Sequence, residues 1–410
     1  MNYAVILAAG KGTRMNTNHA KPILKIFGKE MIKYVFDAIP DSFDNKLCVV
    51  GHKKEEMINI LDDKVTYVYQ SEFLGTAHAL GMTLDYINVH GNTLVLSGDV
   101  PLIDKETLTN LLDKHINEDN DITLLTTILD NPKDYGRVKR KKGKIVEIIE
   151  EKNLKKDNIN EVYSGIMILK NHILGFIKDI KQNQNNEYYL TDLIKLTSKE
   201  YKIGSLICED NLKVMGVNDK ESISMVSEIL RKRIIDFHIS NGVIIPFKDK
   251  VLIYPDCVIE KDTYIDEFVS IKGNNKISSD VKIGPFSNIR EGNIIKNNVK
   301  IGSFVEIKES TIGEYTSIAH HAYIGNTIIG DNTTIGAGVK VANFDGKIKS
   351  TTKIGSNTLI GCNTVLVSPI QIGDNCYIGA GSIIRNDIEN YTFLKPHISF
   401  ETLKNKNNSI

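Results

Sequence analysis

The sequence predicts two domains: an α/β domain with a Rossmann-like, mostly parallel sheet over residues 1–218, and a left-handed parallel β-helix over residues 249–396. Three observations lead to this fold class. At 410 residues the chain is longer than one ordinary hydrophobic core. Short apolar segments alternate with amphipathic segments in its first half. Isoleucines recur every six residues in its last third.

The first half alternates strands and helices, which is typical of a sheet covered on both faces. Apolar runs predict strands over Tyr3–Leu7, Lys46–Val50, Val65–Gln70, Thr93–Leu96 and Ile122–Thr127. Periodic apolar residues predict helices over Met31–Ala38, Lys54–Leu61 and Lys105–Ile116. In the basic run 137–144, Gly143 separates two strand-like stretches, so we interpret the run as a solvated hairpin; a phosphate-binding patch is the alternative.

Between the two domains, residues 219–248 are predicted to form a linker that begins with an amphipathic helix. Apolar residues step by three and four along this helix, at Ile223, Val226, Leu230, Ile234 and Phe237. The β-helix is expected to begin near Lys250, and residues 397–410 are predicted to be a polar C-terminal tail.

The last third of the chain has a period of six residues, which no helix has. Ten isoleucines stand six residues apart from Ile253 to Ile307. In a left-handed β-helix each triangular coil has three six-residue sides, and one aliphatic residue of each side points inward. Ordinary short strands are the disfavoured alternative, because their pattern would repeat every two residues.

The six-residue period is interrupted at three places. It shifts by one residue before Ile312 and again before Ile329, and it breaks between Val341 and Ile354. Glycine follows many of the inward positions, and we expect these glycines at corners that need unusual backbone angles.

Composition and termini argue against several classes of protein. The formal net charge is zero, so neither nucleic acid nor a membrane surface is expected as a partner. The N-terminus lacks a basic segment and an apolar stretch long enough for a signal or a membrane span. The five cysteines are scattered without CxxC spacing, which favours reduced thiols in a cytoplasmic protein and argues against zinc or disulfides.

A glycine-rich loop, LAAGKGTRM over residues 7–15, follows the first predicted strand. It does not match the Walker loop, because no Gly-Lys-Ser/Thr stands at the needed spacing. It does not match the dinucleotide-binding pattern either, because Met15 stands where a third glycine is needed. Small residues still let backbone N–H groups approach an anion, and Lys11, Arg14 and Lys21 add positive charge. The loop therefore predicts a phosphate-binding site, with a tight strand–helix turn as the alternative.

Together with later segments, this loop resembles the sugar-1-phosphate nucleotidyltransferase family. The segments occur in the family's order: QSEFLGTAHA from Gln70, SGDVPL from Ser97, YGR from Tyr135, IEEK from Ile149, EYYLTD from Glu187 and GVN from Gly216. Joined to a hexapeptide β-helix, they are similar over about residues 3–400 to a bacterial bifunctional family. That family combines N-acetylglucosamine-1-phosphate uridylyltransferase and glucosamine-1-phosphate N-acetyltransferase.

The resemblance implies an enzyme of UDP-N-acetylglucosamine synthesis for peptidoglycan. Residues 1–218 would transfer uridylyl from UTP to N-acetylglucosamine-1-phosphate and release pyrophosphate. Residues 249–396 would earlier transfer acetyl from acetyl-CoA to glucosamine-1-phosphate. One alternative is a single-activity sugar-1-phosphate nucleotidyltransferase whose β-helix serves only trimer assembly, and another is a non-catalytic subunit. The resemblance also implies a homotrimer, in which the flat faces of the β-helix pack side by side around a threefold axis.

For the first reaction, the resemblance assigns Mg²⁺ to Asp99 and Asn218, and a catalytic role to Lys21 and Arg14. A turn at Asp99 and a helix cap at Asn218 are the alternatives. The resemblance assigns substrate binding to Leu7, Ala8, Gly10, Lys11, Gln70, Gly75, Thr76, Gly136, Glu150, Tyr163 and Asn218. Tyr163 stands where the family has Asn, which puts the sugar preference in doubt.

For the second reaction, the resemblance makes His320 the general base, with the neighbouring His321 as its rival and a purely solvent-facing pair as the alternative. The residues implied to bind the sugar phosphate are Arg290, Lys308, Tyr323, Asn343 and Lys349. The residues implied to bind acetyl-CoA are Ala337, Asn343, Phe344, Cys362, Gly379 and Lys395. Phe344, Cys362 and Lys395 depart from the family's Tyr, Ser and Arg.

Overall fold

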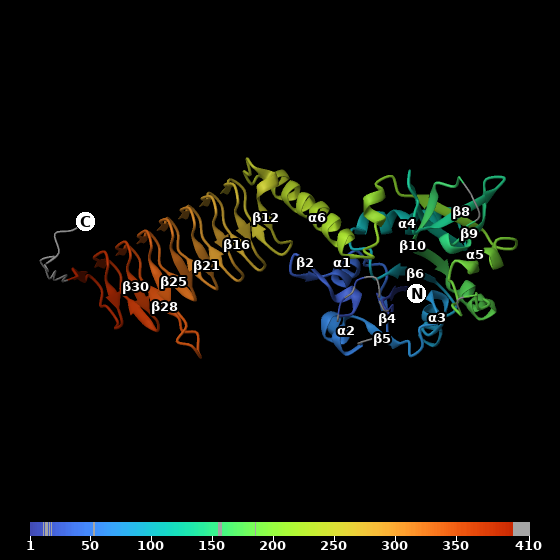
Figure 1. The fold of residues 1–410 in the computed structure, drawn as a ribbon, viewed down its shortest axis with the longest axis horizontal. Helices are drawn as coiled ribbons and strands as arrows, with labels where there is room; N and C mark the ends of the chain where they lie inside the picture. The colour runs from blue at the N-terminus through green and yellow to red at the C-terminus, as the bar shows by residue number, and fades with distance from the viewer. Residues whose placement is uncertain are drawn as a thin grey trace, which may run out of the picture. The chain divides into compact units, whose positions relative to one another are not determined.

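The computed structural model describes residues 1–396 except 11, 13, 14, 16, 18, 52, 53, 155–157 and 185. The predictions for Lys11, Arg14 and the tail 397–410 therefore lie outside the described residues. The chain divides into two compact units, Met1–Glu228 and Ile229–Ile410. Figure 1 shows the α/β elements of the first unit and the stacked coils of the second.

The first unit contains a mixed sheet with the strand order β11-β7-β10-β6-β1-β4-β5. Its strands are β1 (Asn2–Leu7), β4 (Asn45–Val50), β5 (Thr66–Tyr69), β6 (Asn92–Ser97), β7 (Ile122–Ile128), β10 (Glu161–Lys170) and β11 (Ile203–Ile207). Neighbours within β6-β1-β4-β5 and within β11-β7 run parallel, as expected. The sequence did not predict β10, which runs antiparallel between β6 and β7 and makes the sheet mixed.

These strands read as continuous apolar runs because both faces of the sheet are covered. Ala4 and Ile6 of β1 are buried in one core, whereas Tyr3 and Val5 are buried in the other. The predicted strands and helices all occur, with ends displaced by at most one residue: α1 is Met31–Asp37, α2 is Lys54–Leu61 and α4 is Lys105–Asn117. The shorter α3 (Thr76–Gly81) and α5 (Asp192–Thr197) complete the layers.

The basic run forms the expected hairpin. Strands β8 (Gly136–Lys141) and β9 (Lys144–Ile149) pair antiparallel. Lys142 and Gly143 between them both have a positive φ, 52° and 79°, as a tight two-residue hairpin turn requires.

The helix α6 (Lys220–Ser240) crosses the division between the two units. Its start is capped by Asp219, whose Oδ1 accepts a hydrogen bond from the Ser222 N–H at 2.8 Å. Beyond α6, Val243 and Ile245 are already buried in the core of the second unit. No helix in the described ranges is both long and apolar enough to cross a membrane.

The second unit is a β-helix whose three sheets each take every third strand of the chain. One sheet runs through β12 (Leu252–Ile253), β15 (Ser270–Ile271), β18 (Asn288–Ile289), β21 (Glu306–Lys308), β24 (Tyr323–Gly325), β27 (Lys340–Ala342), β30 (Val365–Val367) and β33 (Ile383–Ile384). The predicted inward residues are at most 6 % exposed, from Ile253 to Ile384. This burial confirms the six-residue period as the signature of the fold.

The glycines after the inward positions have a different role from the expected one. In the described coils these glycines do not have a positive φ. The left-handed corners lie three residues after the inward positions, for example at Asn274, Phe286 and Asn298, with φ between 57° and 60°. The glycines are explained by close stacking of coils, since a Cβ on Gly336 would lie 2.6 Å from the Cys362 nitrogen.

A second set of inward residues stands two positions before the aliphatic ones and was not predicted. It is apolar in some coils, as at Val281 and Val299, and polar in others. Asn275 and Asn293 are fully buried, and Nδ2 of Asn293 donates to Oδ1 of Asn275 at 2.8 Å. Oδ1 of Asn293 in turn accepts from the Ser310 N–H at 3.0 Å. These side chains satisfy backbone groups at one corner, where the coil cannot pair as a strand.

Candidate active sites

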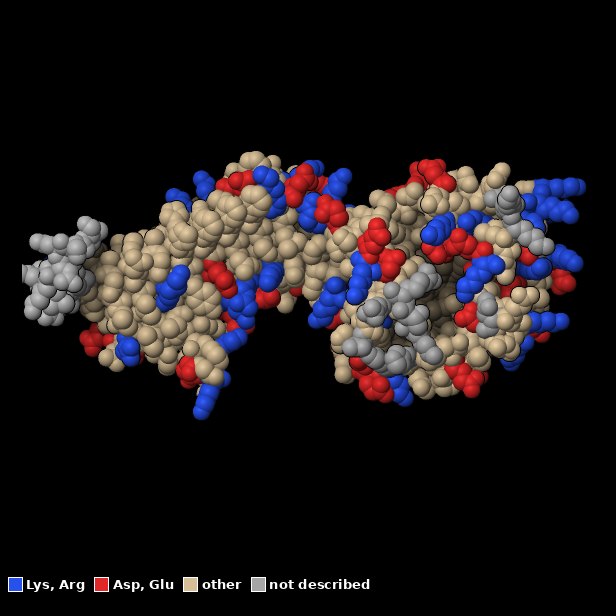
Figure 2. All heavy atoms as spheres, viewed as in Figure 1, with Lys and Arg blue, Asp and Glu red and all other residues tan. Residues whose placement is uncertain are grey.

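The first unit contains an open cavity of about 790 Å³ at the carboxyl ends of β1 and β6. In an α/β sheet this edge is where ligands are commonly bound. All described candidates of the first site line it: Leu7, Ala8, Gly10, Lys21, Gln70, Gly75, Thr76, Asp99, Gly136, Glu150, Tyr163 and Asn218. Figure 2 shows a hollow in this unit with charged side chains near its rim.

Lys21 lies between the two candidate metal ligands. Its Nζ forms an ion pair with Oδ2 of Asp99 and donates to Oδ1 of Asn218 at 2.9 Å. Oδ1 of Asp99 accepts from the Ser97 hydroxyl at 2.6 Å, which fixes the carboxylate. Two side-chain oxygens therefore meet at the Lys21 ammonium. Two such oxygen ligands would suit a hard divalent metal ion.

Asn218 was predicted either to bind a metal ion or to cap the helix that follows it. The cap of α6 is Asp219, so the Asn218 side chain is available to Lys21. Among the described residues, no cluster of three or more His, Cys, Asp or Glu side chains could hold a metal by itself. An ion at Asp99 and Asn218 would consequently take further ligands from water and from substrate phosphates.

Burial raises the pKa of three polar groups that line the cavity, Glu150, Tyr163 and Tyr135. Oε1 of Glu150 accepts from the Thr191 hydroxyl at 2.7 Å, and burial raises the pKa of this carboxyl. Tyr163 is 9 % exposed, and burial raises the pKa of its phenol, so its hydroxyl stays protonated. Burial also raises the pKa of Tyr135, a lining residue that sequence reasoning had used only as part of a motif.

Gln70 and the glycine turn after it form another part of the cavity. Gln70 is 3 % exposed, and its Nε2 lies 2.8 Å from Nδ1 of His78. Gly75 has φ 99°, and a Cβ there would lie 2.6 Å from the Tyr188 carbonyl oxygen, so no side chain fits. The backbone of this turn therefore lines the cavity, where it could form hydrogen bonds with a planar ligand.

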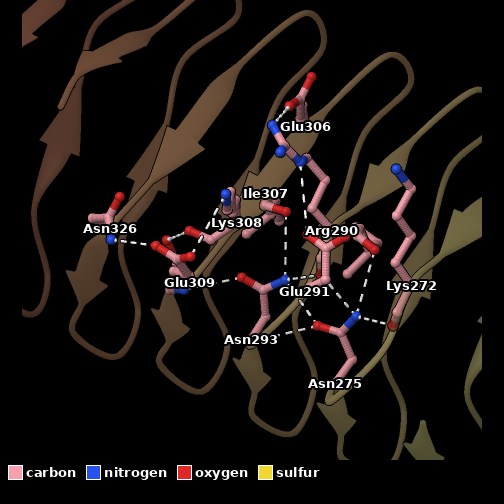
Figure 3. A network of polar contacts seen from close by, with 12 residues as sticks. Lys272, Asn275, Arg290, Glu291, Asn293, Glu306, Ile307, Lys308, Glu309 and Asn326 are labelled. Atoms are coloured by element: carbon pink, nitrogen blue, oxygen red, sulfur yellow. Dashed lines mark hydrogen bonds and ion pairs between the residues drawn. The ribbon is translucent and has the colours of Figure 1, made fainter. Parts of the chain in front are cut away.

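In the second unit, the predicted cations lie near one another but already have acidic partners. Nη1 of Arg290 is 3.0 Å from Oε1 of Glu306, and Nζ of Lys308 is 3.6 Å from Oε1 of Glu309 (Figure 3). Tyr323 pairs in register with Glu306 on the next strand. Sequence reasoning missed both glutamates, because neither belongs to a motif and the six-residue period marks only the inward positions.

Asn343 and Lys349 belong to the same cluster. Asn343 is 7 % exposed, and its Nδ2 donates to Oδ1 of Asn326 at 2.6 Å. The pKa of Glu309 is lowered by a hydrogen bond from Asn326, and by Lys308 and Lys349 nearby. Two residues of the break in period between Val341 and Ile354 therefore belong to this cluster, Asn343 near its start and Lys349 in its middle.

The two histidines have different surroundings. His321 stacks on Phe304 with ring centroids 5.0 Å apart and continues a row of exposed rings formed with Phe268 and Phe286. Nδ1 of His320 accepts a long hydrogen bond from the Ser303 N–H at 3.4 Å. Since His321 is held in the ring stack, His320 is the better candidate for proton transfer, once this weak contact opens.

The other acetyl-CoA candidates lie on successive coils nearer the C-terminus. The Ala337 carbonyl accepts from the Asn363 N–H at 2.8 Å, and the Cys362 carbonyl accepts from the Gly381 N–H at 2.8 Å. Gly379 and Lys395 lie on the two coils that follow, and the Gly379 N–H donates to the Leu394 carbonyl at 2.7 Å. Cys362 has an exposed, free thiol, and Phe344 is 58 % exposed.

Comparisons with known proteins cover both units. A family model described as nucleotidyl transferase matches residues 3–211. Models described as GMPPB C-terminal domain and bacterial transferase hexapeptide (six repeats) match residues 271–345 and 351–386.

Several curated relatives match nearly the whole chain, and all carry the name bifunctional protein GlmU. The relative from Acetivibrio thermocellus is 37% identical over 95% of this chain and 93% of its own. The relative from Thermosipho africanus is 40% identical over 94% of this chain and 92% of its own. The relative from Thermoanaerobacter pseudethanolicus is 38% identical over 94% and 93%.

These likenesses confirm the bifunctional transferase inferred from the motifs, and they do not favour the single-activity alternative. The first unit matches a nucleotidyltransferase model, and part of the second matches a model named for transferases. The chain belongs to the family of bifunctional GlmU proteins.

Proposed function

We propose that this chain makes UDP-N-acetylglucosamine in two steps at two separate sites. The β-helix acetylates glucosamine-1-phosphate with acetyl-CoA, and the α/β unit then transfers uridylyl from UTP to the N-acetylated sugar phosphate. The observation that carries the second step is the meeting of Asp99 and Asn218 at the Lys21 ammonium, inside a cavity lined by a glycine-rich loop.

Uridylyl transfer joins two anions, so the site must supply positive charge where the phosphates meet. Asp99 and Asn218 would hold Mg²⁺, which supplies charge to the triphosphate when bound. Lys21 is released from these oxygens and turns its ammonium toward the phosphates. The sugar phosphate oxygen attacks the α-phosphorus while pyrophosphate leaves, and Glu150 holds a sugar hydroxyl.

Acetyl transfer needs an unprotonated amine at the thioester carbon. Arg290, Lys308 and Lys349 bind the sugar phosphate, which competes with Glu306 and Glu309 for these cations. His320 takes a proton from the amine as it attacks the acetyl carbon, and coenzyme A leaves as its thiol. The acetyl-CoA chain runs along the coils that carry Ala337, Cys362, Gly379 and Lys395.

We further propose that the β-helix assembles a homotrimer and that the enzyme works in the cytoplasm. The three flat sheets of the β-helix support the first proposal. Five free thiols, in Cys48, Cys208, Cys257, Cys362 and Cys376, support the second. Mass measurement in solution tests the trimer: a mass of one chain would contradict it.

A coupled assay tests the two reactions together. The enzyme receives glucosamine-1-phosphate, acetyl-CoA, UTP and Mg²⁺, while free thiol and pyrophosphate are followed separately. The proposal predicts that thiol appears first and that pyrophosphate follows only when acetyl-CoA is present. Pyrophosphate release from N-acetylglucosamine-1-phosphate without any thiol release in the full mixture would reject the acetyltransferase step.

A further inference from the structure

The two one-residue shifts in the β-helix lie on one corner and bring polar side chains into line. Glu309 lies two residues after the inward Ile307, and Asn326 lies two residues after the inward Ile324. Both have a positive φ, 47° and 51°. The Asn326 N–H donates to the Lys308 carbonyl at 3.0 Å, which stacks the two corners. Asn343 continues the line, and we call Glu309, Asn326 and Asn343 the polar ladder.

The polar ladder has a single direction because one end can only accept hydrogen bonds. Oε2 of Glu309 accepts from Nδ2 of Asn326 at 2.7 Å (Figure 3). Oδ1 of Asn326 therefore faces Asn343 and accepts from its Nδ2 at 2.6 Å. This leaves Oδ1 of Asn343 facing the Tyr323 hydroxyl, at 3.4 Å. One carboxylate thus orients two amides in succession.

The surroundings keep Glu309 ionised, so the direction of the ladder is stable. The hydrogen bond from Asn326 and the ammonium groups of Lys308 and Lys349 lower the pKa of Glu309. A neutral amide at this position could donate or accept, and both directions of the ladder would then be populated. The negative charge therefore selects one orientation of Asn343.

The far end of the ladder meets Tyr323 in a space that a glycine keeps open. A Cβ on Gly325 would lie 2.6 Å from the Tyr323 hydroxyl oxygen and 2.9 Å from Nδ2 of Asn343. Asn343 is 7 % exposed, so its amide has little freedom except to rotate by half a turn. Such a rotation exchanges its oxygen and nitrogen, and the short hydrogen bond from its Nδ2 to Oδ1 of Asn326 opposes it.

We propose that Glu309 and Asn326 are positioning residues for acetyl transfer, acting through the orientation of the Asn343 amide. The inference rests on the acetyltransferase activity proposed above. An amide oxygen beside Tyr323 accepts an N–H of the amino sugar and directs its lone pair toward the thioester. The reversed amide presents its own N–H to the amine and holds it poorly.

A reversal and its rescue test this role. Glu309→Lys replaces the acceptor with a donor, so the Asn326 oxygen turns toward it and Asn343 is reversed. Adding Asn326→Asp restores the direction, because the new carboxylate accepts from both neighbours. We expect Glu309→Lys to lower kcat/KM of acetyl transfer about tenfold, and the double variant to lie within about threefold of wild type. Uridylyl transfer serves as the folding control and remains at the wild-type rate in both.

A third background separates positioning from general damage. If Glu309 acts through Asn343, Glu309→Lys has no further effect on acetyl transfer in an Asn343→Ala protein. Wild-type acetyl transfer in the single variant, absence of rescue in the double variant, or an undiminished effect in the Asn343→Ala background overturns the proposal. A wild-type enzyme that never releases thiol refutes the acetyltransferase function itself, and the positioning role with it.

Discussion

Because His115 is buried, we predict that the first unit loses stability in acid. His115 lies on α4 and is 1 % exposed, with Nδ1 at 2.9 Å from the Thr123 hydroxyl and Nε2 at 3.2 Å from Oδ1 of Asn92. The amide oxygen of Asn92 accepts, so Nε2 carries the proton and Nδ1 accepts from Thr123. Protonating Nδ1 would turn this acceptor into a donor, and its hydrogen bond from the Thr123 hydroxyl would be lost.

Burial lowers the pKa of His115 from 6.5 to about 4. Between pH 6.5 and about pH 4, His115 is therefore protonated in the unfolded chain but neutral in the folded chain. The free energy of unfolding consequently decreases as the pH falls through this range. Linkage over the shift gives a loss of about 2 kcal/mol between pH 7 and pH 5, and about 3 kcal/mol by pH 4.

Comparison with His115→Gln isolates this contribution, because glutamine is neutral at every pH and can still donate and accept. Hydrogen exchange of the α4 amides, corrected for the intrinsic pH dependence of exchange, reports the opening free energy of this unit in the full chain. The difference between wild type and variant should shrink by about 2 kcal/mol from pH 7 to pH 5. Parallel pH curves for the two proteins would refute the reasoning.

Three further predictions concern the sites and the scaffold. Lys21→Met should lower uridylyl transfer by about 100-fold or more and leave acetyl transfer intact, measured as pyrophosphate and thiol release; equal loss of both would contradict separate sites. Gly325→Ala should lower acetyl transfer and leave uridylyl transfer intact, because its Cβ would collide with the Tyr323 hydroxyl. Unchanged thiol release would show that acetyl transfer does not need the space beside Gly325. Asn293→Ala leaves buried partners unsatisfied and should cost about 2–4 kcal/mol in urea unfolding of the β-helix; a cost under about 0.5 kcal/mol would show that the asparagine row is dispensable.

Much of the fold was predictable because its signals are local and repetitive. The parallel strands of the first unit are buried on both faces, so they appear as apolar runs, and the six-residue period appears directly as isoleucines. Strand β10 was missed because nothing in its sequence indicates that it inserts antiparallel between β6 and β7. The corner geometry was misassigned because tight stacking and unusual φ both favour glycine.

The candidate sites were predictable at the level of motif residues, and less so in their contacts. The resemblance implied Asp99 and Asn218 as joint metal ligands, but their shared contact with Lys21 joins segments far apart in the chain and was not predicted. Glu309 and Asn326 carried no motif at all. The shift before Ile312 aligns Glu309 with Asn326, and the shift before Ile329 aligns Asn326 with Asn343. In each case residues 17 positions apart become neighbours where a spacing of 18 would be expected.

The central claim is that two chemistries occupy two independent sites, and a crossed pair of variants tests it most directly. Thiol and pyrophosphate release are measured for Asp99→Ala and for His320→Ala, each with the substrates of both reactions. The account predicts that Asp99→Ala abolishes pyrophosphate release from N-acetylglucosamine-1-phosphate but keeps thiol release, and that His320→Ala does the reverse. Loss of both products in either correctly folded variant, or loss of neither, would contradict it.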